Sequence, residues 1–438
     1  MVLKVKKGSE KFEGLLPSEP FRTPQNPSEH FNPLSDMKRI LFIAVAMVLA
    51  LGANAQGRNT GMGGSDGDYQ SLSERVFKLE KKTDAFNVYF NYAAGFQELF
   101  TEDDAFSKFT NKQARIEIKG NLTDKISYRW RHRLNKNNTA MGTDNFAKAT
   151  DILMVGYQFN DKWSIQGGKM CQNHGGFEFD ENPMYIYQYS DMVDYMDNFM
   201  AGVNLSFKPV PNHEFDLNIT NSYNDGFSDY YGISAFFGKD NKLEKYYASK
   251  HPLTYIFLWA GNMFDGMLQT RWSYSLQNQG EDANDHKLCL GQQLVLPNFQ
   301  WYIDYMGEWD DIDRLGIASA DGASYLAKQG AGFFSGVTYH SLITKANWQF
   351  APQWNLMLKG CYETASVADV AAFDGYRKSA LWMANLEYYP DKSQDFRVFL
   401  SYVGRHYTFS DEAKAAAGLD DYNTNRLELG FMFRIKAF

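Results

Sequence analysis

The sequence predicts an all-β fold: a transmembrane antiparallel β-barrel of about sixteen strands, with short turns at one end and long loops at the other. Three observations predict it. After an export signal, no apolar run approaches the roughly 20 residues that a membrane-spanning helix needs. Apolar and polar residues alternate with period two through most of the chain, which is typical of strands with two different faces. Aromatic residues make up 16% of the chain, and such barrels carry aromatic girdles at both membrane interfaces.

The export signal lies at residues 37–55. Two basic residues precede a short apolar run, which ends at the small-x-small cleavage site Ala53-Asn54-Ala55. We expect the mature protein to begin near Gln56 and residues 1–36 to be a mis-called leader. The alternative, an internal membrane anchor, is disfavoured because the apolar run is too short to span a bilayer. Loss of residues 1–55 changes the net charge from −8 to −10.

Residues 56–83 are expected to form a Gly-rich linker followed by a short heptad-like periplasmic segment. Apolar positions in this segment are spaced four, three and four residues apart, at Leu72, Val76, Leu79 and Thr83. The stripe is too short to be helical alone. Two interpretations stay open: a small helix that helps three barrels associate, or a solvated amphipathic linker.

Residues 84–438 are expected to form the barrel. Segments of alternating residues recur along this part, each of roughly the ten residues that a tilted strand needs to cross a bilayer. The predicted strands are 85–99, 112–121, 125–134, 149–159, 162–170, 198–207, 213–221, 253–262, 266–277, 286–296, 299–309, 335–350, 353–363, 378–389, 395–407 and 424–438.

The connections between these segments alternate in length. Tight, turn-rich connections are predicted at 121–124, 160–161, 208–212, 296–298, 351–353 and 390–394. Long ones are predicted at 100–111, 135–148, 171–197, 222–252, 310–334, 364–377 and 408–423. Short turns on one side of the membrane and long loops on the other are typical of outer-membrane barrels, whose long loops face outward.

One strand indicates which face meets lipid. In the segment 125–134, basic and polar side chains share one face and apolar ones the other: Lys125, Ser127, Arg129, Arg131 and Arg133 against Ile126, Tyr128, Trp130, His132 and Leu134. A one-residue slip would exchange the two faces. Because Arg or Lys on the lipid face costs about 2–4 kcal/mol near the midplane, the basic face is expected to line a wet interior.

The last segment has the same pattern. Before the terminal Phe438, apolar and mostly polar positions alternate: Leu427, Leu429, Phe431, Phe433 and Ile435 against Arg426, Glu428, Met432, Arg434 and Lys436. An amphipathic strand that closes on an aromatic residue is typical of an outer-membrane barrel. The sequence therefore predicts a barrel with a polar lumen, embedded in a lipid bilayer.

A basic ladder follows from this facing. Arg115 and Lys119, separated by Glu117, share a face of the strand that precedes 125–134. With the antiparallel neighbour, the predicted anion-binding pore lining is Arg115, Lys119, Lys125, Arg129, Arg131 and Arg133. Fixed cations in a narrow opening attract anions, and guanidinium groups suit phosphate or carboxylate. The alternative is a patch of arginines facing acids that orients water and solutes without selectivity.

The third long loop is the predicted counterpart of the ladder. It carries the acidic residues Glu178, Asp180, Glu181 and Asp191 among many aromatic ones. A loop this apolar is expected to fold inward and narrow the pore, with its aromatic rings against the wall and its acids meeting the basic patch. The alternative is an outward loop at a contact between three copies of the chain.

Short motifs in and beside this loop resemble the phosphate-selective porin O and P family. They are Gly168-Lys169-Met170, Gly175-Gly176, Glu181-Asn182-Pro183, Tyr189-Ser190-Asp191 and Tyr195-Met196-Asp197-Asn198-Phe199-Met200. The resemblance covers the predicted barrel and implies a sixteen-stranded homotrimeric porin in the outer membrane of a Gram-negative bacterium. It also implies that small anions such as phosphate are guided by Arg129, Arg131 and Arg133, with Arg115, Lys119 and Lys125 as further candidates.

Other classes fit less well. A non-selective general porin stays open. A barrel enzyme is less favoured, because the histidines are scattered and no Gly-x-Ser-x-Gly elbow accompanies them. A surface adhesin is also less favoured, because the long loops that it would use are normal for porins. We expect no catalytic residue, cofactor, metal or nucleic-acid partner. The three cysteines, Cys171, Cys289 and Cys361, are odd in number and widely spaced, so no disulfide framework can be assigned.

Overall fold

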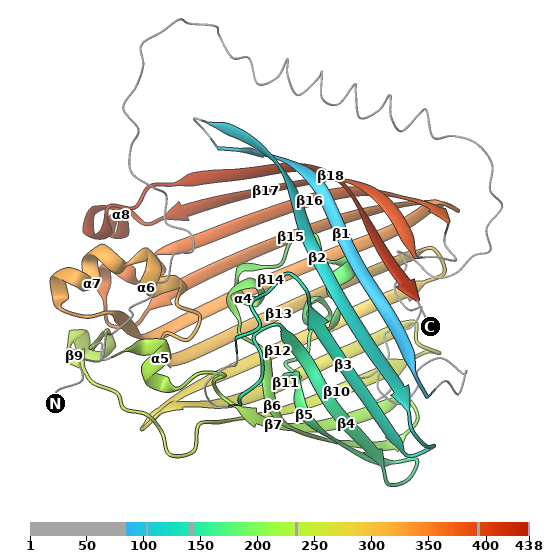
Figure 1. Cartoon of the computed structure of the whole chain (residues 1–438). Coiled ribbons are helices and arrows are strands. Elements are labelled where there is room, and N and C mark those ends of the chain that lie inside the picture. The colour runs from blue at the N-terminus through green and yellow to red at the C-terminus, as the bar shows by residue number, and fades with distance from the viewer. Residues whose placement is uncertain (1–84, 102–103, 140–143, 233–234, 392–394, 437–438) are drawn as a thin grey trace, which may run out of the picture. The chain divides into compact units, whose positions relative to one another are not determined.

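The computed structural model describes residues 85–436, apart from 102–103, 140–143, 233–234 and 392–394. The predicted leader, signal peptide and linker lie outside the described residues. Within them, sixteen long strands form a closed antiparallel barrel (Figure 1), in which β1 (Asn87–Phe100) pairs with both β2 (Ala105–Asn121) and β18 (Tyr422–Lys436). The predicted fold class is confirmed.

The other long strands each pair with the next one along the barrel. They are β3 (Ile126–Arg133), β4 (Thr150–Gln158), β5 (Trp163–Cys171), β6 (Phe199–Val210), β7 (His213–Asn221), β10 (Leu253–Met263), β11 (Leu268–Gly280), β12 (Ala283–Leu296), β13 (Phe299–Ile312), β14 (Phe333–Ala351), β15 (Trp354–Val367), β16 (Arg377–Asp391) and β17 (Phe396–Phe409). All sixteen predicted strands are present, and their ends agree within four residues except at the start of β2.

The prediction of a long loop at 100–111 is wrong. β1 continues to Phe100 and β2 already begins at Ala105, because the two strands stay paired as far as Phe100 opposite Ala105. At the same end of the barrel, β11 and β12 are joined by two residues only, and Asp282 takes a positive φ of 59° in this turn. The other predicted long connections are present.

Helices and short strands occupy these long connections. They are α3 (Phe177–Asp180), η2 (Pro183–Tyr185), α4 (Asp191–Tyr195), α5 (Phe227–Tyr231), β8 (Phe236–Phe237), η3 (Lys239–Asn241), β9 (Leu243–Glu244), α6 (Ile317–Asp321), α7 (Ala323–Gln329), η4 (Ala371–Phe373) and α8 (Asp411–Ala417). The hairpin β8–β9 extends the sheet by parallel pairing of β8 with the start of β14. In the described part, no helix is both long and apolar enough to cross a membrane.

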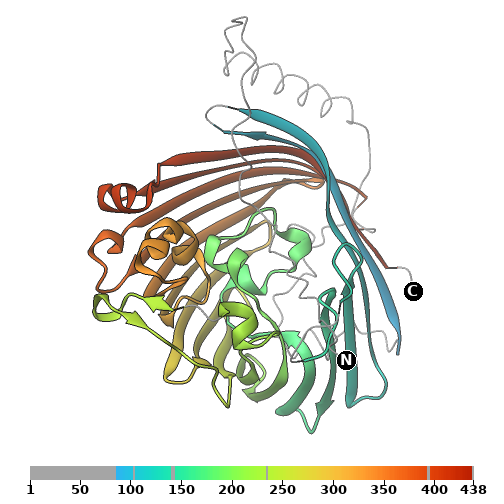
Figure 2. The same cartoon turned by 60° about the vertical axis from the view of Figure 1, so that its left-hand side comes forward.

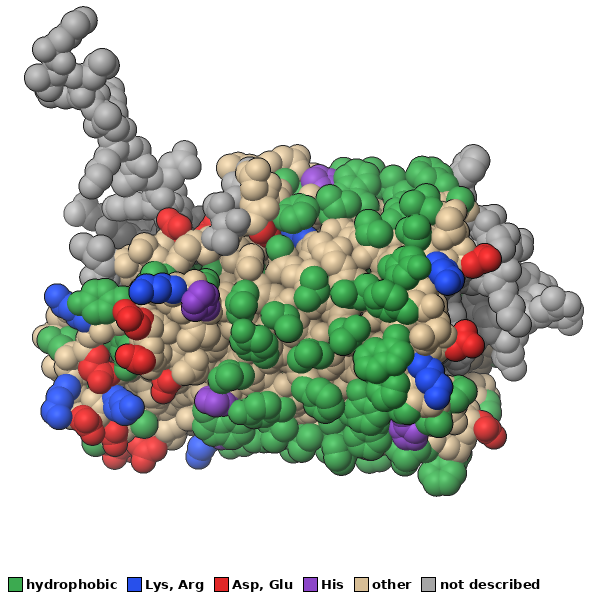
Figure 3. All heavy atoms as spheres, turned by 90° about the horizontal axis from the view of Figure 1, so that it is seen from below, with side chains coloured by type: hydrophobic (Ala, Val, Ile, Leu, Met, Phe, Trp, Pro, Cys, Tyr) green, Lys and Arg blue, Asp and Glu red, His purple; other side chains and the backbone are tan. Residues whose placement is uncertain are grey.

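The predicted facing of the strands is confirmed. On β4, Leu153 and Val155 are exposed on the outer wall, whereas Ile152 and Met154 are buried inside the barrel. Figure 3 shows that apolar side chains form a broad band across the outer wall, while charged ones gather toward its two ends. On β18, the inward Glu428, with Met432 and Arg434, is buried as the alternation predicts.

The interior of the barrel is packed along one side. Residues 172–198, which we call the inner loop, lie within the ring of strands (Figure 2) and contain α3, η2 and α4. Phe177, Met184 and Tyr187 of this loop join a buried cluster with Tyr302 of β13 and Phe399 of β17. The inner loop thus narrows the lumen from one wall, as predicted. Burial of its aromatic side chains stabilises this inward position.

The three cysteines lie in different surroundings. Cys289 and Cys361 are buried thiols within the same apolar cluster, whereas Cys171 is half-buried at the end of β5.

Candidate functional site

The basic ladder lies on the lumen face of β2 and β3. β2 and β3 pair in a register that sets Arg115 opposite Arg133, Glu117 opposite Arg131 and Lys119 opposite Arg129. Residues directly opposite each other in an antiparallel pair point to the same face, so these side chains form one patch. The structure therefore brings five of the six predicted cations together. Lys125 lies apart from them, exposed in the turn before β3.

Two buried carboxylates form ion pairs with the arginines of the ladder. Glu117 accepts a hydrogen bond of 2.7 Å from Arg129 and lies 3.8 Å from Arg434 of β18. Asp151 of β4 lies 2.8 Å from Arg133, and two further guanidinium groups approach the same oxygen: Arg131 at 3.4 Å and Arg115 at 4.0 Å. These ion pairs hold the guanidinium groups in fixed positions along the wall.

A β-bulge places Asp151 in the lumen. Arg131 pairs with Ile152 and His132 with Thr150, so Asp151 is the extra residue on β4. Simple alternation with Leu153 and Val155 would have put its carboxylate on the lipid side. Bulges commonly redirect a side chain in this way, and here the bulge delivers the carboxylate to the arginines.

A second bulge adds a cation that the sequence analysis missed. Ala93 of β1 pairs with Gln113 and Ala94 with Asn111, so Lys112 is the extra residue on β2. Its Nζ atom reaches inward to Glu428 at 2.7 Å and lies over the inner-loop ring of Tyr187. The available signal was a lysine at a position that alternation assigns to lipid, where it would cost about 2–4 kcal/mol near the midplane.

The cations of this wall are more accessible than their carboxylate partners. The Arg133 side chain is 22% exposed and Asp151 2%; Arg129 is 14% exposed and Glu117 2%. The same asymmetry recurs beside the inner loop, where Lys112 is 16% and Arg426 of β18 is 19% exposed above a fully buried Glu428. In each of these ion pairs on the β18–β4 side of the barrel, the side chain that reaches the lumen surface is therefore the cation.

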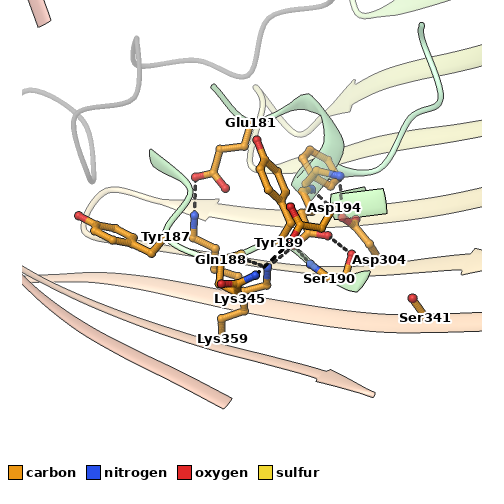
Figure 4. A network of polar contacts seen from close by, with 12 residues as sticks. Glu181, Tyr187, Gln188, Tyr189, Ser190, Asp194, Asp304, Ser341, Lys345 and Lys359 are labelled. Carbon is orange, nitrogen blue, oxygen red and sulfur yellow. Dashed lines mark hydrogen bonds and ion pairs between the residues drawn. The ribbon is translucent and has the colours of Figure 1, made fainter. Parts of the chain in front are cut away.

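The four acidic residues predicted in the constriction all form ion pairs. Glu178 contacts Lys359 of β15, and Glu181 contacts Lys345 of β14. Asp180 lies 3.3 Å from Arg271 of β11, and Asp191 is held by Arg377 of β16, at 2.7 Å, and by Arg405 of β17. Figure 4 shows the centre of this network, with Lys345 and Lys359 of the wall pointing toward the inner loop.

The expectation that these acids would meet the basic ladder is therefore wrong. Their partners are cations of β11 and β14–β17, because the inner loop lies against that wall and buries its carboxylates there. A buried carboxylate needs a close counter-charge, and the nearest ones belong to the covered wall. The ion pairs of these four acids therefore lie on the wall that the loop covers, whereas the ladder arginines pair with Glu117 and Asp151.

Backbone groups fix the inner loop further. Asp304 of β13 accepts hydrogen bonds from the N–H groups of Phe177, at 2.7 Å, and Glu178, at 2.8 Å. At the far side of the loop, Arg426 donates to the carbonyl oxygen of Tyr187 at 2.8 Å. These contacts position the loop at both ends of its path across the lumen.

Among the described residues, one group of carboxylates has the spacing of a metal site. Oxygen atoms of Asp285, Glu308 and Asp310 lie within 4.8 Å of one another on β12 and β13. However, Lys287 Nζ lies 3.1 Å from Glu308 and 4.0 Å from Asp285, and the backbone N–H of Arg314 donates to Asp310 at 2.9 Å. Since an ammonium group already compensates this cluster, we assign no metal to it.

Solved structures share this architecture. The outer membrane channel DcaP of Acinetobacter baumannii aligns with a TM-score of 0.54 and 10% identity, over 80% of this chain and 97% of that one. OmpF of Salmonella typhi, solved in complex with daunomycin, aligns with a TM-score of 0.52 and 12% identity, over 82% and 100%. At such low identity, these similarities show the fold alone.

Sequence comparisons give the family. No curated protein sequence matches this chain significantly. Residues 86–435, the whole of the barrel within a residue or so of each end, match the family described as phosphate-selective porin O and P. Together with the closed barrel, the lipid-facing apolar band and the charged lumen, this match shows that the chain belongs to the phosphate-selective porin O and P family and is a porin of a Gram-negative outer membrane.

Proposed function

We propose that this porin prefers anions and passes small phosphate-like anions by passive diffusion. The observation that carries the proposal is the exposure of the wall charges: the arginines and lysines meet the lumen, while their carboxylate partners lie buried beneath them. Fixed charge in a narrow opening with low-dielectric walls acts strongly on passing ions. A cationic surface layer therefore raises the local concentration of anions.

The balance of charge supports the same proposal. On β2–β4, four guanidinium groups, those of Arg115, Arg129, Arg131 and Arg133, surround two carboxylates. Beside the inner loop, Lys112 and Arg426 share Glu428. Each group keeps a net positive charge, and guanidinium offers the forked donor geometry that suits phosphate.

A non-selective general porin is the second candidate. It is favoured by the ion pairs themselves, since each ladder arginine already contacts a carboxylate, and by the net charge of −8 for the chain. In that case the wall charges would orient water and solutes without discriminating between ions. Ion selectivity separates the two candidates directly.

The test is the reversal potential of the purified protein in a planar bilayer with a KCl gradient. We expect a reversal potential with the sign of the chloride equilibrium potential (the sign of chloride), because the exposed charges are cationic. Phosphate added to the chloride solution should then reduce the chloride current in a saturable manner, since it competes for the same guanidinium groups. A potential with the sign of potassium would contradict anion preference, and a potential near zero would favour the general porin.

We further propose that the protein acts as a channel and not as an enzyme or an adhesin. Histidines on the strands hydrogen-bond to neighbouring tyrosines, as expected in an aromatic girdle. The Tyr274 hydroxyl lies 2.6 Å from His286 Nδ1, and the Tyr305 hydroxyl lies 2.9 Å from His340 Nδ1. Such pairs suit the membrane interface and provide no nucleophile. A purified barrel that inserted into bilayers without conducting would contradict the channel function.

Finally, we propose that the barrel assembles as a homotrimer with its long loops outside the cell. Support comes from the heptad-like stripe Leu72-Val76-Leu79 ahead of the barrel and from the architecture that the family resemblance implies. We expect native mass measurement in mild detergent to give three copies of the chain. A monomer alone under these conditions would contradict the prediction.

A further inference from the structure

Two tyrosines expose their rings inside the barrel, at the end where the long loops lie. Tyr422 is on the inward face of β18, in line with Thr424 and Arg426, yet it is 43% exposed. Tyr195, at the end of α4 in the inner loop, is 55% exposed. We call these two residues the mouth tyrosines.

The ring of Tyr422 is held rigidly. It stacks on Tyr407 of β17 with ring centroids 4.5 Å apart and an interplanar angle of 28°. Tyr407 is buried and points into the barrel. Its hydroxyl donates to Asp191 of the inner loop at 3.3 Å and accepts from Arg405 at 3.1 Å. One face of the Tyr422 ring is therefore covered. Because the residue is nonetheless exposed, the other face of the ring is available to a solute.

Exposed aromatic rings have an evident role on the outer wall, where they meet lipid headgroups. The mouth tyrosines meet water instead, so burying their free faces against a flat solute would be favourable. Accessible cations lie further along the same wall. Arg426 lies four residues from Tyr422 on the same face of β18, about 13 Å along a strand that rises ~3.3 Å per residue. Lys112 lies beside Arg426, since both contact Glu428.

We infer that the mouth tyrosines, Arg426 and Lys112 form a binding site for organic anions that carry a flat ring, such as phosphorylated nucleosides. The ring of the solute stacks on Tyr422, and its phosphate contacts the cations further in. The inference rests on the proposed anion preference and deepens it by naming the solute class. Stacking on aromatic side chains combined with a cationic track is a general means of binding nucleotides without sequence preference.

The experiment compares block of the chloride current by adenosine triphosphate, whose phosphate chain is long enough to extend from a stacked base toward Arg426, and by inorganic triphosphate in planar bilayers. We expect adenosine triphosphate to block the wild-type protein at about tenfold lower concentration, the effect of one stacked base. Tyr422→Leu should remove this advantage while leaving block by inorganic triphosphate unchanged, and Tyr422→Phe, which keeps the ring, should preserve it. An unchanged single-channel conductance shows that each variant is folded.

Tyr255→Leu is the matched control, because Tyr255 of β10 is also 43% exposed but faces lipid. It should leave both blocks unchanged. Equal block by the two anions in the wild type, or a Tyr422→Leu variant that behaves as the wild type, would overturn the inference while leaving anion preference intact. By contrast, absence of block by either anion, with a reversal potential of the sign of potassium, would overturn the proposed function itself.

Discussion

Replacement of Arg129, Arg131 and Arg133 by glutamine is expected to shift the ion preference of the porin strongly toward cations. Glutamine keeps hydrogen-bonding capacity at the wall but removes three fixed positive charges. Of the five guanidinium groups within 4.0 Å of Glu117 or Asp151, only those of Arg115 and Arg434 then remain. Because Glu117 and Asp151 stay in the lumen wall, most of the excess positive charge around them is lost, and the field that attracts anions should weaken accordingly.

The measurement is the reversal potential in a KCl gradient together with block by phosphate. We expect the potential to move from the sign of chloride toward that of potassium and the phosphate block to disappear. The matched control replaces the same three arginines by lysine, which retains the charge but loses the forked geometry. This variant should keep the sign of chloride while its phosphate block weakens. If the glutamine variant kept the selectivity of the wild type, the ladder would not determine ion preference.

The second large effect is expected from Lys359→Gln. Lys359 Nζ contacts the Glu178 carboxylate and donates to the carbonyl oxygen of Gln188 at 2.6 Å. Without the ammonium group, Glu178 retains Ser190 as a donor but loses its buried counter-charge. Removing one partner of a buried ion pair costs about 3–5 kcal/mol. The inner loop should therefore leave the wall more readily, and single-channel recordings should show a larger, fluctuating conductance.

The double variant Glu178→Gln/Lys359→Gln provides the control. It removes both charges, leaves no unpaired buried ion and should recover most of the lost stability and the steady conductance. Thermal unfolding in detergent, followed by circular dichroism, gives the coupling between the two residues as a double-mutant cycle. Equal destabilisation by the single and the double variant would show that the ion pair does not hold the loop.

The strands and their facing could be predicted from the sequence because both depend on local pattern. A strand that separates lipid from a wet lumen must alternate between apolar and polar side chains. A charged side chain on its lipid face costs free energy. The run from Lys125 to Leu134 therefore indicated the inward arginines without any knowledge of their neighbours. The alternation of short and long connections likewise followed from turn residues.

Two kinds of feature required the tertiary structure. The first is the bulge: one extra residue on β2 or β4 reverses the side to which Lys112 or Asp151 points, and local alternation contains no information about it beyond a charged residue on the wrong face. The loop predicted at 100–111 failed for a related reason. Pairing with β1 extends β2 through residues whose own pattern is weak.

The second is the pairing of charges across the lumen. The sequence indicated that the acidic third loop folds inward, but its partners lie far away along the chain; Glu178 and Lys359 are 181 positions apart. Which wall the loop covers depends on the packing of Phe177, Met184 and Tyr187 against β13 and β17. That packing determines which cations are neutralised and which remain at the lumen surface, because a buried carboxylate must pair with the nearest counter-charge wherever the folded chain places it.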